Sequence, residues 1–79
     1  MADIVITSAV RTAIGAFGGS LSRLTGAELG QVVISEALKR SQVDGADVSE
    51  VVMGQVLTAA AGQNPARQAS INAGIPKEV

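Results

Sequence analysis

The hydrophobic residues near the N-terminus form a short run with no polar alternation. Residues 4–10 are Ile-Val-Ile-Thr-Ser-Ala-Val, in which three β-branched apolar residues follow one another. Such a run is typical of a strand covered on both faces, as in the parallel sheets of α/β proteins. Residues 51–57, Val-Val-Met-Gly-Gln-Val-Leu, predict a second strand, in which Gly54 indicates a bulge or a close backbone approach.

Between these runs, apolar positions recur at helical spacing. The expected apolar face consists of Leu29, Val32, Val33, Ile34, Ala37 and Leu38. Thr25 and Glu28 fit a capping box, in which the Thr25 side chain accepts from the Glu28 amide and the Glu28 side chain reaches back to the Thr25 amide. Glu36 precedes Arg40 by four residues, a spacing that favours an ion pair along a helix. We predict a helix from Thr25 to Arg40.

The residues from 64 to 76 carry start and stop signals of a second helix. Asn64 suits the N-cap and Pro65 the first helical position, while Gly74 suits the position just past the end and Pro76 prevents continuation. The predicted order is therefore β-α-β-α, and the predicted class is α/β. Two strands and two helices cannot cover both faces of a sheet, so we expect this chain to need more protein around it.

The connecting segments hold two patterns that could bind ligands. Residues 11–24 form a loop in which Gly15 to Gly19 follow a predicted strand, but their spacing does not match G-x-G-x-x-G and no helix starts directly after them. A structural loop is therefore favoured over a phosphate cradle. Three carboxylates at positions 44, 47 and 50 lack the alternate spacing of a calcium loop, so they favour a solvated turn.

The composition excludes several classes of chemistry. The 79 residues include no Cys, His, Tyr or Trp, which rules out the usual zinc ligands, a thiol nucleophile and a Ser-His-Asp triad within the chain. We predict no catalytic, cofactor-binding or metal-binding residue here. The net charge of −1 and a single aromatic argue against nucleic-acid binding. No apolar run approaches the roughly 18 residues of a membrane span, and a cytoplasmic protein fits.

Two arginines are candidates for polar contacts. Arg11 follows the first predicted strand and could bind an anion or hold its own loop, and the structural use is favoured. Arg67 lies in the first turn of the second predicted helix, where a cation is unfavourable to the helix dipole. This placement suggests a partner outside the helix, such as a carboxylate or the carbonyls of a neighbouring chain, with a solvated arginine as the alternative.

Three segments resemble the thiolase family. Residues 6–19, Ile-Thr-Ser-Ala-Val-Arg-Thr-Ala-Ile-Gly-Ala-Phe-Gly-Gly, are similar to the opening strand and loop of thiolases. Residues 54–57, Gly-Gln-Val-Leu, and 62–69, Gly-Gln-Asn-Pro-Ala-Arg-Gln-Ala, resemble a second stretch of the family. The resemblance covers essentially all 79 residues and is greatest to the bacterial biosynthetic members. Ala13 departs from the proline that many members carry, which changes only the rigidity of the loop.

The resemblance implies a layered α/β/α/β/α architecture, of which residues 1–79 form a partial N-terminal domain that ends before the nucleophile-bearing segment. It implies an acyltransferase that condenses two acetyl-CoA molecules to acetoacetyl-CoA and CoA, or runs the reverse thiolysis, through a cysteine acyl-enzyme. The cysteines and the histidine of that chemistry lie outside this stretch, which is expected to be inactive alone. Coenzyme A thioesters are the implied substrates, with no covalently bound cofactor.

The resemblance also implies partners. Thiolases form dimers or tetramers, and Gln63, Asn64 and Arg67 are the residues expected near a subunit contact. The alternative to a thiolase scaffold is a free-standing, non-enzymatic α/β module that dimerises through its Ala-rich second helix and an exposed strand edge. The two differ in whether the isolated chain folds cooperatively into one defined oligomer.

Overall fold

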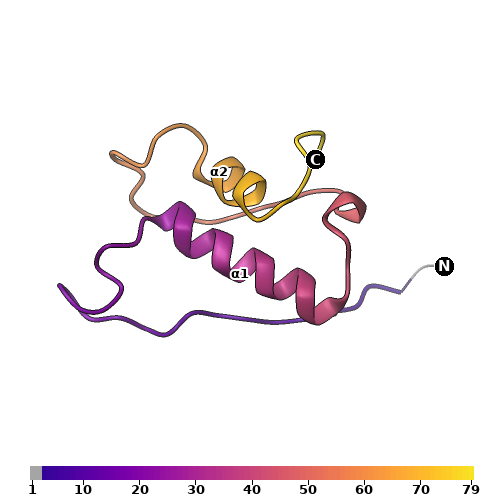
Figure 1. Cartoon of the computed structure of the whole chain (residues 1–79), viewed down its shortest axis with the longest axis horizontal. Coiled ribbons are helices and arrows are strands. Elements are labelled where there is room, and N and C mark those ends of the chain that lie inside the picture. The colour runs from indigo at the N-terminus through magenta and orange to yellow at the C-terminus, as the bar shows by residue number, and fades with distance from the viewer. Residues whose placement is uncertain (1–2) are drawn as a thin grey trace.

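A computed structural model describes residues 3–79 of the chain (Figure 1). The elements run in the order α1 (Gly26–Ser41), a 3₁₀ turn η1 (Gly45–Asp47) and α2 (Pro65–Asn72). Figure 1 shows α2 beside α1, with the chain that follows η1 running back along the helix pair. The N-terminal segment passes along α1, where the Ser8 hydroxyl donates to the carbonyl oxygen of Ala37 at 2.9 Å.

The first predicted helix is confirmed, and its start is the predicted one. The Glu28 N–H donates to Thr25 Oγ1 at 3.1 Å, which satisfies one of the free amides of the first turn. The second half of the predicted capping box is wrong, because the Thr25 hydroxyl itself donates to the Glu28 carboxylate at 3.2 Å. The expected pair of Arg40 and Glu36 forms at 2.8 Å on the exposed face of the helix.

The end of α1 is a Schellman motif built around a residue other than glycine. Gln42 takes the left-handed conformation with φ of 57°. The Val43 N–H donates to the Leu38 carbonyl at 3.1 Å and the Gln42 N–H to that of Lys39 at 3.3 Å. These two bonds are the pair that defines the motif, so the helix ends without free carbonyls at these positions.

The second predicted helix is also confirmed at both ends. Asn64 Oδ1 accepts from the Arg67 N–H at 3.2 Å, and Pro65 occupies the first helical position. At the other end Gly74 has φ of 95°, and the Ile75 N–H donates to the Ser70 carbonyl at 3.0 Å. Glycine adopts such a φ at no steric cost, so Gly74 can end the helix in the left-handed conformation.

The two predicted strands are not confirmed by this structure. No residue between 3 and 79 belongs to a strand, and the segments 4–10 and 51–57 run without a paired neighbour. Most of their apolar side chains face solvent, with Ile6 89% and Val56 97% exposed, whereas Val10 and Val51 are half-buried. A strand is held by hydrogen bonds to another strand, and two strands alone are marginal in water. The apolar sequence of the two segments predicted strands, but the described residues provide no second strand for either segment to pair with.

The buried interior is small and lies where the helices cross. Ala69 and Ile75 are the buried hydrophobic residues of the described part, with 1% and 3% of their surface exposed. Gly30 of α1 faces Ala69 closely, since a Cβ built on Gly30 would lie 3.0 Å from the Ala69 Cβ. The accessible surface is 6367 Å², whereas a compact protein of this mass exposes roughly 4,400 Å². The helices are thus well defined, but most of the apolar surface is uncovered.

Candidate functional site

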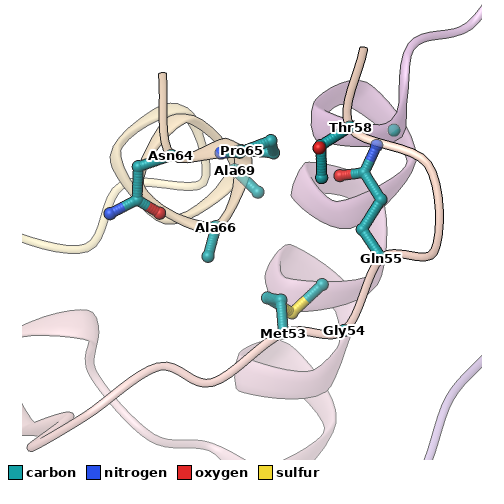
Figure 2. A pocket seen from close by; sticks show the side chains of 9 residues that line it. Met53, Gly54, Gln55, Thr58, Asn64, Pro65, Ala66 and Ala69 are labelled. Atoms are coloured by element: carbon teal, nitrogen blue, oxygen red, sulfur yellow. The ribbon is translucent and has the colours of Figure 1, made fainter. Parts of the chain in front are cut away.

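A cavity of about 310 Å³ lies where the N-terminal ends of α1 and α2 meet the segment 53–58. Figure 2 shows Ala66 and Ala69 lining it from α2 and Met53 closing it from the connecting segment. The full lining comprises Gly26, Met53, Gly54, Gln55, Thr58, Asn64, Pro65, Ala66 and Ala69. Small side chains from both helices leave this space open.

Two polar side chains face the cavity from the segment that follows Gly54. The Gln55 and Thr58 side chains lie beside each other at one end of the cavity in Figure 2. Gln55 Nε2 donates to the Leu57 carbonyl at 2.8 Å, which folds the side chain back over its own segment. Gly26 permits this, because a Cβ there would lie 3.1 Å from Gln55 Nε2.

The chemistry available in this cavity is hydrogen bonding and apolar contact. None of its lining residues carries a carboxylate, an amine or an imidazole. The Thr58 hydroxyl has no base in the lining to activate it, and nucleophilic catalysis by a hydroxyl depends on such a base. The cavity can therefore form part of a wall for a ligand, but its own residues do not supply acid–base or nucleophilic groups.

The predicted interface residues lie together at the start of α2, and all three are exposed. Asn64 and Arg67 line a second, more polar hollow of about 230 Å³, which Gln63 does not line. The Arg67 guanidinium reaches backbone oxygens of its own chain, donating from Nη1 to Lys77 at 2.9 Å and to Val79 at 3.4 Å. The structure thus gives Arg67 partners within its own chain, whereas the expectation was a carboxylate or the carbonyls of a neighbouring chain. An interface role stays a prediction for these residues.

Gln68 was not predicted from the sequence as a residue of the site. The Gln68 side chain donates from Nε2 to the carbonyl oxygens of Ala61, at 3.0 Å, and Gln63, at 2.9 Å. The residue types alone show only that such a contact is possible, because a glutamine amide can donate to two carbonyls; the path of the loop, which decides it, has no local pattern. Gln68 therefore links the backbone at residues 61 and 63 to α2.

The other candidate residues have local structural partners. Arg11 Nη1 donates to the Thr12 carbonyl at 3.0 Å, in agreement with the favoured structural use. Asp44 Oδ1 accepts from the Ala46 N–H at 3.0 Å and so caps η1. Within residues 3–79, no group of three potential metal ligands comes together. No helix of the described region has the length and apolar character needed to cross a membrane.

Comparison with known proteins shows the family to which this chain is similar. Residues 4–79 match the family model described as thiolase, N-terminal domain. The chain is 62% identical over 79 residues, its whole length, to the acetyl-CoA acetyltransferase of Cupriavidus necator. It is 54% identical over 76 residues, 96% of the chain, to that of Pseudomonas aeruginosa. Against the cytosolic acetyl-CoA acetyltransferase of Mus musculus it is 57% identical over 76 residues, again 96% of the chain.

The matches cover the whole of this chain, or nearly so, but only a small share of each relative. The chain spans 20% of the length of the Cupriavidus necator relative and 19% of the length of the other two. The similarity therefore concerns about a fifth of each of these longer proteins.

Proposed function

The chain belongs to the thiolase family by its N-terminal domain, and from this premise we propose that it is the N-terminal scaffold of an acetyl-CoA acetyltransferase. The observation that carries the proposal is the 62% identity over the whole chain to a protein of that name. The cavity supports a scaffold role, because its lining offers hydrogen bonds and apolar contact without reactive groups.

The proposed reaction is the condensation of two acetyl-CoA molecules to acetoacetyl-CoA with release of CoA, or the reverse thiolysis. A histidine takes the proton from a cysteine thiol, the thiolate takes the acetyl group from the first acetyl-CoA, and the proton passes to CoA, which leaves as the thiol. A second cysteine takes a proton from the methyl carbon of the second acetyl-CoA, and that carbon attacks the acyl-enzyme and frees the first cysteine, which regains a proton. Since the 79 residues include no Cys and no His, these groups come from outside this stretch. Coenzyme A thioesters act as substrates, and no covalently bound cofactor is proposed.

The proposal extends to the fold that surrounds this chain. We propose that residues 1–79 form part of a thiolase N-terminal domain, in which segments 4–10 and 51–57 become strands of a sheet within a layered α/β/α/β/α arrangement. Their exposed apolar side chains support this, because both faces of such strands are normally covered. The sheet would bury the surface that the isolated chain leaves in water.

The partners follow from the same premise. We propose a homo-oligomer, a dimer or a tetramer, in which Gln63, Asn64 and Arg67 lie near a contact between subunits. Their exposure at one end of α2 supports this role. We also propose a cytoplasmic location, which agrees with the names of the mouse and rat relatives, both called cytosolic.

An activity assay tests the proposed function. The complete natural polypeptide that carries these residues should consume acetoacetyl-CoA only when free CoA is added, and alkylation of its cysteines should abolish the rate. The 79-residue chain alone, assayed at the same concentration, should give no rate above buffer. Turnover by the isolated chain, or a complete polypeptide that does not use CoA, would contradict the proposal.

A further inference from the structure

Gln68 ties the loop of residues 58–63 to the beginning of α2. Its Nε2 donates to the Ala61 carbonyl at 3.0 Å and to the Gln63 carbonyl at 2.9 Å. A primary amide nitrogen carries two hydrogens, so both bonds form at once. The side chain is partly buried beneath the loop that it holds. One side chain therefore binds two carbonyls that lie two residues apart.

The loop is poorly supported without Gln68. Ala60 has φ of 59° and Gly62 has φ of 80°, and the left-handed region is unfavourable for a residue with a Cβ. Within the loop one backbone bond is formed, from the Ala61 N–H to the Thr58 carbonyl at 3.1 Å. Strained backbone persists only where its surroundings hold it in place, and here the Gln68 amide is the group that does so.

Gly62 and Gln68 fit each other closely. A Cβ built on Gly62 would lie 2.9 Å from Gln68 Nε2, closer than such atoms approach in proteins. Glycine is favoured at this position by its positive φ, and the absence of a Cβ leaves the space that the amide occupies. The loop and the glutamine act as one unit.

We propose that Gln68 is a positioning residue that holds residues 61–63 in the shape in which Gln63 is presented to a second copy of this chain. The Gln63 carbonyl points back to Gln68 while its side chain remains exposed. Asn64 and Arg67 continue the same exposed end of α2, so the fixed loop extends the polar surface next to it. This inference rests on the subunit contact proposed above and adds the residue that shapes it.

The test substitutes Gln68→Glu in the complete natural polypeptide. A carboxylate has no hydrogen to donate, so both bonds are lost and the two carbonyl oxygens face a negative charge. At neutral pH we expect exchange of the Ala61 amide, which forms the one backbone bond within the loop, to accelerate by roughly tenfold or more, since two hydrogen bonds that support the loop are removed. Sedimentation velocity should show weaker assembly in the same sample.

A pH comparison separates positioning from general damage. At about pH 5 the introduced carboxyl, facing two oxygens, is expected to hold its proton above the ordinary Glu value of about 4.3 and to donate one bond again. Loop exchange and assembly of Gln68→Glu should then recover in part, relative to the unsubstituted protein at the same pH. Gln68→Met, which lacks any donor, should stay impaired at both pH values.

The matched control is Gln31→Glu. Gln31 Nε2 donates to the Asn72 carbonyl at 3.1 Å, so this variant also loses a side-chain bond to a carbonyl, but at a distance from the loop. It should leave exchange of the Ala61 amide unchanged. Unchanged loop exchange in Gln68→Glu, or a loosened loop with assembly intact, overturns the inference. Normal assembly of a Gln63→Ala variant contradicts the subunit contact itself, independently of the loop readout.

Discussion

Gln42 holds a backbone conformation that most residues avoid. Its φ of 57° closes the Schellman motif at the end of α1, at a cost of roughly 1–2 kcal/mol for a residue with a Cβ. Gln42→Gly should remove most of this cost. Amide exchange in the last turn of α1 should slow by about fivefold, which corresponds to roughly 1 kcal/mol. Hydrogen exchange of the complete polypeptide measures this directly.

The control for Gln42→Gly is a glycine placed inside the same helix. Lys39→Gly introduces the same residue in the last turn at a helical position, where glycine costs roughly 1 kcal/mol relative to alanine. Exchange there should become faster instead of slower. If Gln42→Gly also accelerates exchange, the strain attributed to Gln42 is absent.

At the residue scale the helix ends could be predicted from the sequence, because helix caps depend on residues three to six positions apart. Thr25, Asn64 and Gly74 were identified from residue type and spacing, and all three act as predicted. The contact between Gln68 and the loop could not be derived in this way. It depends on the chain folding back between residues 58 and 63, and no local pattern specifies that path.

At the scale of elements, the crossing of α1 and α2 depends on the absence of a side chain at Gly30. A Cβ there would lie 3.0 Å from the Ala69 Cβ and 3.3 Å from Met53 Cε. The methionine end can move, whereas the Ala69 methyl group is fixed to its helix. Close packing of the two helices therefore requires that one of the two facing positions be very small.

This contact predicts a coupling between two substitutions. Gly30→Ala gains helix propensity but forces the helices apart, while Ala69→Gly removes the opposing methyl group. The double variant should be more stable than the sum of the single effects by about 1 kcal/mol, a typical coupling for contacting residues. Denaturant unfolding of the complete polypeptide measures it. Additive effects would show that the two positions do not touch.

The predicted strands show where sequence reasoning reaches its limit. The apolar runs at 4–10 and 51–57 predicted buried strands, whereas Ile6 and Val56 lie almost fully in solvent here. Strand formation is a property of two backbones together. The order of helices followed from local signals, but the sheet depends on partners that these residues do not provide.

At the scale of the whole molecule, the solvent-accessible surface is larger than that of a compact protein of the same mass. The chain exposes 6367 Å², about 2,000 Å² more than a compact protein of its size. One partner's share of a standard protein interface is only about 800 Å². The radius of gyration of 13.7 Å also exceeds the roughly 11.6 Å expected for 79 residues. So large an exposed surface supports the proposed scaffold role, in which other protein would cover it.

Thermal melting of the isolated 79-residue chain, followed by circular dichroism together with sedimentation velocity, tests this claim most directly. A chain that needs further protein to cover its apolar segments should show partial helicity that declines gradually with temperature, and it should aggregate or sediment as a mixture of species. A single cooperative transition from one defined monomer or dimer would contradict the account, because it would show that these residues build a sufficient core alone.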